Sequence, residues 1–379
     1  SQGLIPLSKE EYDKIPSVKI ENQLGFVDST PDSYSLEKYV PKVQRQRGNS
    51  CVGFAYLYYG LSTQYNAKLK ITNPIDKIAH SFDPYYAYNL LSSEFDECIE
   101  PIIPTKALEL LKKKGAKKKF YSPHIECFTT ENSSDNYIDK YTKPYSIDAY
   151  HKVSSTDEAK VIISIQNKPV IFGMFTTKSF FNVGDNGYYA LTDQESMHIK
   201  KTYEKWDEGT LSKYEQDIFI QEYLPHAMTI IGYDDNKFGG AFRVVNSYGK
   251  DWGDKGYFWL KYKDFKTLTT GVFTLDLSSD INYNKNPQFN FDGYQRVTEG
   301  MDLKEGESYE GFLYGGKRNG IGIDSWTNEE SKRFSAIGNF ENNIPNGFFT
   351  FILSEEEYII GNYIDGEYVN MQAVPMPFY

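Results

Sequence analysis

The sequence is poor in the residues that build metal centres and disulfide frameworks. It has 3 cysteines and 5 histidines among 379 residues, and the histidines are too dispersed to predict a zinc site. No hydrophobic run approaches the roughly 20 residues that cross a bilayer, and the mean hydropathy is −0.56. We therefore expect no cofactor and no transmembrane segment.

Clustered positive charge is also missing. The chain carries 41 basic and 52 acidic residues, a net charge of −11, and the basic residues are scattered. An acidic chain repels phosphate backbones, which argues against nucleic acid as a partner. Aromatic residues, in contrast, are abundant, with 32 tyrosines and 25 phenylalanines. So much apolar mass predicts a well-packed globular protein and excludes a disordered one.

Helical patterns come first along the chain and strand patterns follow. Residues 1–30 are polar and irregular and predict an N-terminal arm. Apolar spacing and start signals predict helices at about 50–65, from Asp83, at 105–114 and at about 155–168. β-Branched and aromatic runs predict strands at 169–175, 226–234, 241–248, 256–262 and 271–277. This order is typical of an α+β fold.

A long charged stretch, about 182–224, separates the first two predicted strands. It is longer than an ordinary connection, so we expect it to fold as an insertion. Two positions are open for it: over a cleft as a lid, or on the surface away from any site.

The tail has a texture of its own. Residues 278–288 are polar and predict a linker, and 289–379 repeat aromatic residues, glycines and Asn-Gly pairs. The spacings of 27 and 23 residues between Gly311, Gly338 and Gly361 predict stacked β-hairpins. We expect this all-β module to pack around a small core of Phe312, Tyr314, Phe340 and Tyr363, and to dock on the preceding domain or on another copy.

One constellation of residues indicates nucleophilic catalysis. Cys51 stands where a polar loop becomes a helix, and a helix N-terminus favours the thiolate. His226 opens the strong strand pattern HAMTIIGYD, and Asn246 ends another strand pattern 20 residues later. Adjacent strands could bring the two together, with the amide orienting the imidazole that serves the thiol as its base.

The three blocks QRGNSCVGFA, HAMTIIGYD and VVNSYGKDWGDKGYFWLKY resemble, in order, the cysteine, histidine and asparagine segments of papain-like cysteine peptidases. The resemblance implies a papain-like fold over 31–277, with an N-terminal helical domain packed on an antiparallel β domain. It also implies Cys51 as nucleophile, His226 as general acid/base and Asn246 as orienter.

The sequence departs from that family at several places. The oxyanion glutamine usually lies six residues before the cysteine, where Arg45 stands here, so Gln46 is the first candidate and Gln44 the reserve. Tyr248 replaces a tryptophan that usually shields the asparagine–histidine bond. The family's Gly-Gly element is missing from CIEPIIP (98–104), which leaves substrate specificity open.

The resemblance therefore implies a peptidase acting on a protein or peptide substrate. Two alternatives remain: a catalytically silent papain-fold binding protein, and another acyl-transfer enzyme on the same scaffold, such as a deamidase or isopeptidase. The tail resembles MORN repeats, which implies a possible protein or lipid partner.

Two cysteines beyond Cys51 bear on the compartment. In the resembled family this part of the helical domain often holds a disulfide, which here would join Cys98 to Cys127. A bridge would indicate a secreted or exported protein, and reduced thiols a cytoplasmic one.

Overall fold

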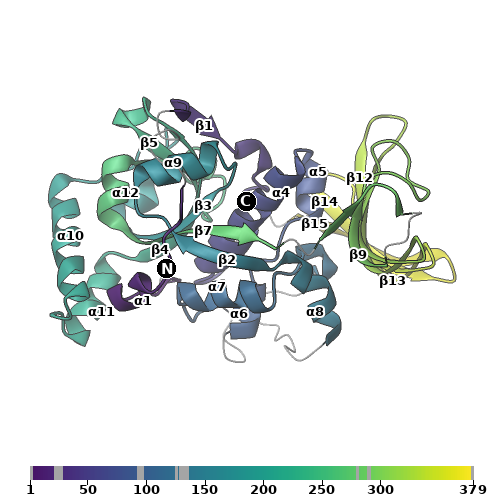
Figure 1. Cartoon of the computed structure of the whole chain (residues 1–379), viewed down its shortest axis with the longest axis horizontal. Helices are drawn as coiled ribbons and strands as arrows, with labels where there is room; N and C mark the ends of the chain where they lie inside the picture. Colours follow the sequence, from purple (N-terminus) through teal and green to yellow (C-terminus); the bar gives the residue numbers. More distant parts are fainter. Residues whose placement is uncertain are drawn as a thin grey trace.

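The computed structural model describes residues 3–20, 29–91, 98–123, 127, 136–278, 281–287 and 292–376. A seven-stranded antiparallel sheet, a helical part and a C-terminal eight-stranded sheet lie side by side across the molecule, with the helical part between the two sheets (Figure 1). The expected α+β papain-like architecture followed by an all-β module is confirmed.

One buried helix organises the helical part. It runs without a break through α3 (Cys51–Gly53), η2 (Phe54–Leu61) and α4 (Ser62–Leu69), and η2 has π-helical geometry. Glycines let neighbours approach closely: a Cβ on Gly53 would lie 1.9 Å from the Pro84 carbonyl oxygen, and one on Gly60 would lie 2.7 Å from Ile171. The start of this helix is therefore fixed in the core.

The helices before and after it along the chain are shorter. The expected helix from Asp83 begins at Tyr86, and Asp83 Oδ1 accepts the Tyr85 N–H in the turn just before it. The sequence patterns also missed α5. The elements are α1 (Lys9–Asp13), η1 (Glu37–Tyr39), α5 (Pro74–Ala79), α6 (Tyr86–Leu91), α7 (Pro104–Lys113), η3 (Lys119–Tyr121), α8 (Asn136–Thr142) and η4 (Lys143–Tyr145).

The seven-stranded sheet has the order β2-β7-β3-β4-β5-β6, with β1 pairing to β4. All five expected strands are present, and β1 and β2 are additional. The strands are β1 (Ser33–Ser35), β2 (Ile147–Lys152), β3 (Val170–Phe175), β4 (Pro225–Asp234), β5 (Ala241–Val245), β6 (Tyr257–Lys261) and β7 (Thr269–Leu277). Helices α9 (Thr156–Ser164) and α12 (Tyr262–Leu268) pack against this sheet, and the sheet and the α3–α4 helix share one core.

The insertion at 182–224 forms two helices at the end of the molecule opposite the C-terminal sheet (Figure 1): α10 (Asp193–Asp207) and α11 (Lys213–Glu222). Each begins with a capping box, which fixes its first residue. The rings of Tyr203 and Phe219 pack on Phe175 of β3, and the Tyr203 hydroxyl reaches the Leu7 carbonyl at 3.5 Å. The helical pair thus supports the N-terminal arm, a role the sequence did not suggest. η5 (Lys178–Asn182) leads into it.

The C-terminal module is a meander of paired strands in the order β15 to β8. Residues 282–284, expected within a linker, instead form its first strand, which pairs in parallel with β9. The strands are β8 (Asn282–Asn284), β9 (Gly293–Val297), β10 (Ser308–Tyr314), β11 (Lys317–Thr327), β12 (Arg333–Glu341), β13 (Ile344–Ile352), β14 (Glu357–Ile364) and β15 (Glu367–Pro375).

The repeated glycines make room for aromatic rings in this module. Gly311, Gly322 and Gly338 are cross-strand neighbours in β10, β11 and β12, and a Cβ on Gly322 would lie 2.3 Å from the Tyr309 hydroxyl. The expected core is wrong at one position: the Tyr314 side chain is 70% exposed. A register shift between Gly311 and Leu313 changes the alternation, so that Leu313 is buried instead.

The module docks on the helical part through apolar and charged contacts. Ile75, Phe120 and Tyr121 share a core cluster with Ile337 and Tyr358. Charged and phenolic groups gather beside this cluster around Glu310 of β10, which is fully buried: Lys118, His80, Arg296, Tyr65 and Tyr145. Burial alone would raise the pKa of the Glu310 carboxyl, but Lys118, His80 and Arg296 together hold it well below its usual value.

Candidate active site

Cys51 is the first residue of α3 and lies where the long helix meets the sheet. Its side chain is fully buried, and burial raises the pKa of the thiol to about 11, although a backbone hydrogen bond from Ala227 opposes the shift. That contact brings the thiol to the residue that follows His226 in β4. In the structure as it stands, the thiol is protonated at neutral pH.

His226 and Asn246 meet across adjacent strands. His226 is the second residue of β4, and Asn246 directly follows the end of β5. The distance from His226 Nε2 to Asn246 Oδ1 is 2.7 Å, and the same oxygen accepts the Ser247 backbone N–H. Because an amide oxygen only accepts, it selects the tautomer in which Nε2 carries the proton. His226 Nδ1 is buried and has no hydrogen-bond partner within the described residues.

Aromatic rings cover the histidine–asparagine pair. Tyr248 stacks on His226 with ring centroids 4.8 Å apart, and Phe180 meets the imidazole edge-on at 6.0 Å. Trp252 donates its indole N–H to the Phe180 carbonyl, which fixes both rings. Burial lowers the pKa of His226 to about 4, so this environment favours the neutral imidazole.

Gln46 lies in the loop before Cys51 and is held by two side-chain hydrogen bonds. Its Oε1 accepts from the Ser247 hydroxyl at 2.6 Å, and its Nε2 donates to the Gly48 carbonyl at 2.9 Å. Ser247, which no sequence pattern marked, therefore links the asparagine loop to the candidate oxyanion residue. The backbone of Gln44 bonds to Tyr59 and Gly249, and Gln46 rather than Gln44 lines the adjacent cavity.

Residues 3–7, here called the N-terminal strap, cover the cysteine. Gly3 is so close that a Cβ there would lie 2.5 Å from Cys51 Sγ and 2.5 Å from the Asn49 carbonyl oxygen. The buried Leu4 side chain rests on Gly173 of β3. Backbone hydrogen bonds join Ile102 to Gly3 and Ile5. No sequence pattern marked this contact.

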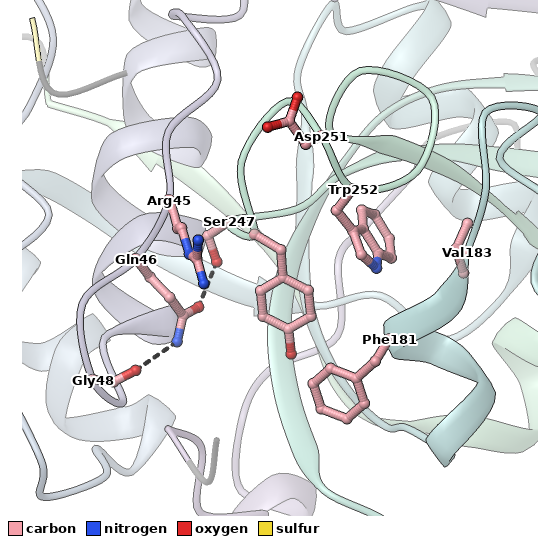
Figure 2. A pocket seen from close by; sticks show the side chains of 9 residues that line it. Arg45, Gln46, Gly48, Phe181, Val183, Ser247, Asp251 and Trp252 are labelled. Carbon is pink, nitrogen blue, oxygen red and sulfur yellow. Dashed lines mark hydrogen bonds between the residues drawn. The ribbon is translucent and has the colours of Figure 1, made fainter. Parts of the chain in front are cut away.

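An open cavity of about 510 Å³ lies beside the covered cysteine. Arg45, Gln46 and Ser247 lie on one side of it, with Phe181, Val183 and Trp252 on the other and Asp251 at one end (Figure 2). Tyr248 also lines it. The cavity therefore reaches from the candidate oxyanion residue to the ring that stacks on His226.

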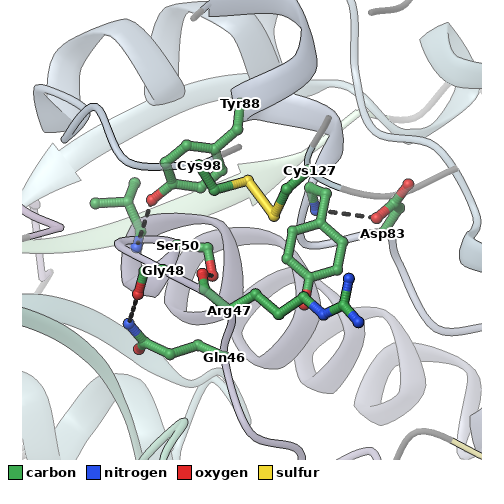
Figure 3. The surroundings of a disulfide bond; sticks show 10 residues. Gln46, Arg47, Gly48, Ser50, Asp83, Tyr88, Cys98 and Cys127 are labelled. Carbon is green, nitrogen blue, oxygen red and sulfur yellow. Dashed lines mark hydrogen bonds between the residues drawn. A yellow bond between two sulfur atoms is a disulfide. The ribbon is translucent and has the colours of Figure 1, made fainter. Parts of the chain in front are cut away.

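Cys98 and Cys127 form a disulfide, in the neighbourhood of Gln46, Gly48 and Ser50 (Figure 3). The Cys98 carbonyl accepts the backbone N–H of Asn49 at 2.7 Å. This hydrogen bond joins the segment that pairs with the strap to the loop that precedes Cys51, and the bridge ties the same segment to Cys127.

Within the described ranges, no group of three or more histidine, cysteine, aspartate or glutamate side chains converges as a metal site. Within the same ranges, no helix combines the length and the apolar character that a membrane crossing requires.

Comparison with known proteins identifies the fold. A family model described as the Peptidase C1-like family matches residues 134–274, a range that holds His226 and Asn246 but not Cys51. No curated protein matches the sequence.

Several solved structures are similar to this chain. Xylellain, a cysteine protease from Xylella fastidiosa, is 17% identical with a TM-score of 0.53, covering 73% of this chain and 96% of its own. Procathepsin B S9 from Trypanosoma congolense is 11% identical with a TM-score of 0.53, covering 73% and 88%. Procathepsin L2 from the larval midgut of Tenebrio molitor is 15% identical with a TM-score of 0.50, covering 73% and 78%. The fold is thus that of papain-like cysteine proteases.

Proposed function

We propose that the protein is a cysteine peptidase that hydrolyses peptide bonds of protein or peptide substrates. The observation that carries this proposal is the hydrogen bond between His226 Nε2 and Asn246 Oδ1, beside a cysteine at a helix N-terminus. The bond leaves Nδ1 available as a base, and the helix start supplies N–H groups that stabilise developing negative charge.

The proposed reaction begins when Cys51 Sγ comes within hydrogen-bond reach of His226 Nδ1, which has no hydrogen-bond partner among the described residues as the structure stands. His226 Nδ1 takes the thiol proton, and Cys51 Sγ attacks the carbonyl carbon of the substrate. The Cys51 N–H and the Gln46 side-chain amide donate to the oxyanion, which requires the amide to turn from the Gly48 carbonyl. His226 then protonates the leaving amine, a thioester remains on Cys51, and water activated by His226 hydrolyses it.

The strap must leave before a substrate can bind, because both Cys51 and His226 have an exposed fraction of 0%. The structure therefore corresponds to a masked form of the proposed enzyme. A masked enzyme and a catalytically silent binding protein would both be inactive when the native chain is assayed. The test must therefore open the strap before activity is measured.

The test combines a thiol-directed peptidyl epoxide with a proteome-derived peptide library, and uses the full chain and a strap-opening variant, Leu4→Glu. We expect labelling of Cys51 and backbone cleavage with Leu4→Glu, and neither with Leu4→Glu/Cys51→Ala. Labelling without cleavage of any peptide would favour the silent binding protein. Release of ammonia or cleavage of side-chain amides alone would favour the other acyl-transfer enzymes.

Two further proposals concern the compartment of the protein and the partner of its hairpin module. The Cys98–Cys127 disulfide favours a secreted or exported protein over a cytoplasmic one, since such bridges persist in oxidising compartments. Fractionation of cells that produce the full-length protein tests this directly.

The hairpin module resembles MORN repeats and would bind a protein or lipid partner. Tyr314, Ile344 and Ile364, which lie at the hairpin turns, are exposed. Co-sedimentation with lipid vesicles tests whether the module binds lipid. Loss of binding in Tyr314→Ser/Ile344→Ser would support this hypothesis, and absence of binding by the native chain would contradict it.

A further inference from the structure

The open cavity reaches the ring that stacks on His226. Under the proposed function, His226 gives its proton to the leaving amine, so the departing half of the substrate must lie beside the imidazole. The cavity is lined by Tyr248, which stacks on that imidazole at 4.8 Å. The strap contacts Ile102 and Gly173, and neither of these residues lines the cavity. The cavity therefore stays open while the strap covers the cysteine.

Two neighbouring phenylalanines of η5 face different surroundings. Phe180 is fully buried and packs on Trp252 with centroids 5.0 Å apart. Phe181 is 44% exposed and lines the cavity (Figure 2). Its ring stacks on Tyr248 at 5.7 Å with only 11° between the planes. A solvent-facing aromatic ring held by a stacked neighbour is a rigid apolar surface, ready to pack against a ligand.

The charges around the cavity do not favour one sign of ligand. Arg45 and Asp251 both line it and carry opposite charges, and they lie on different parts of its wall (Figure 2). The cavity would therefore select a ligand by its size and by apolar contact, and not by its charge. The cavity volume of about 510 Å³ is within the range of about 300–1,000 Å³ that is typical of ligand pockets, which is ample for one large side chain.

We infer that this cavity receives the side chain of the residue directly after the scissile bond, and that Phe181 selects an aromatic or large aliphatic residue there. Phe181 and Tyr248 supply the apolar wall, and Trp252 keeps it rigid through its bond to the Phe180 carbonyl. The inference rests on the proposed function for its direction along the substrate. The apolar surface itself does not depend on catalysis.

The first test compares peptides that differ only in the residue after the cleaved bond. Because burying an aromatic side chain is worth roughly 10- to 100-fold in binding, we expect kcat/KM for phenylalanine to exceed that for alanine about tenfold or more. The Leu4→Glu background opens the cleft. In this background, Phe181→Ser should lower the ratio of the phenylalanine to the alanine kcat/KM to about two or less, and Phe181→Tyr should preserve it. Tyr214→Ser, which removes an exposed aromatic residue of α11 outside the cavity, is the matched control and should leave the ratio unchanged.

The second test measures binding without catalysis. Phenylalanyl-alanine amide and alanyl-alanine amide are titrated into the full chain carrying Cys51→Ala, followed by NMR or calorimetry. We expect the phenylalanyl probe to bind about tenfold more tightly, and Phe181→Ser to remove the difference. If no peptide is cleaved but the probes are discriminated, the proposed function fails and the apolar subsite stands. The inference would be overturned if phenylalanine and alanine peptides were cleaved or bound equally well, and if Phe181→Ser changed neither value.

Discussion

Gly3 lies directly on Cys51, so that a single methyl group added to Gly3 would stand 2.5 Å from Sγ. The nucleophile candidate is thus covered by the backbone of its own chain. The strap is fastened by Leu4 on Gly173, by backbone bonds to Ile102, and by the contact of Leu7 with Tyr203 of the insertion. The helices α10 and α11 of the insertion therefore bear on the site through the strap, while Val183 at the start of the insertion lines the cavity.

Opening the strap should expose the cysteine. Leu4→Glu places a charge in an apolar pocket, which is costly enough to displace the segment. We expect iodoacetamide to label Cys51 at least tenfold faster than in the native chain, as measured by mass spectrometry. Ile5→Glu is the matched control, because it adds the same charge at a neighbouring side chain that is 38% exposed. Equal labelling in all three proteins would show that the strap does not cover the thiol.

The charge state of the pair should change with the strap. Burial disfavours the charged form of both groups, which raises the pKa of the Cys51 thiol to about 11 and lowers that of His226 to about 4. Between these values the masked pair is neutral. We expect ultraviolet difference spectra, with Cys51→Ala as reference, to detect a thiolate in the native chain only near pH 11, and in Leu4→Glu at a lower pH. A thiolate at neutral pH in the native chain would contradict this.

The candidate catalytic residues should differ in how much activity their removal costs. In the Leu4→Glu background, Cys51→Ala and His226→Ala should each abolish peptide cleavage, since members of one catalytic unit fail together. Asn246→Ala should lower activity less, because the imidazole is misoriented and not removed.

Loss of one oxyanion donor in Gln46→Ala should lower kcat about 100- to 1,000-fold. Ser247→Ala removes only the hydrogen bond that holds Gln46, so it should lower kcat less than Gln46→Ala does. Wild-type kcat in Gln46→Ala would move the oxyanion role to another group.

Glu310 should stabilise the contact between the C-terminal module and the helical part of the papain-like domain. It is fully buried with Lys118 and Arg296 against it, and removing one charge from a buried network leaves its partners uncompensated. We expect Glu310→Gln to lower the free energy of unfolding by about 3–5 kcal/mol, as measured by urea denaturation. Glu329→Gln, at an exposed position, is the control and should change it little. A loss below about 1 kcal/mol would mean that the network contributes little to the junction.

Local patterns predicted the parts of this protein that depend on local structure. The start of a buried helix at Cys51 and two strand patterns at His226 and Asn246 were visible because amphipathic spacing and β-branched runs act over a few residues. The contact of Gly3 with Cys51, the bond of Ser247 to Gln46 and the cluster around Glu310 were not visible. Each joins residues that are distant along the chain, and no local periodicity records such a contact.

Truncation after Leu277 should destabilise the remaining protein. The cut removes Ile337 and Tyr358 from the shared cluster and uncovers Ile75, Phe120 and Tyr121. It also takes away Glu310, the carboxylate that faces Lys118 and His80 in the buried network. Uncovered apolar surface of this kind leads to aggregation.

We therefore expect the shortened chain to be insoluble or to unfold at much lower urea concentration than the whole. Co-expression with residues 278–379 as a separate polypeptide should restore soluble protein, because the removed strands pair mainly with one another and can present the same docking face. A truncated chain that stays soluble, binds the phenylalanyl probe and unfolds at the native urea concentration would show that the module is an appendage. The docking contacts would then contribute nothing to the stability of the papain-like domain.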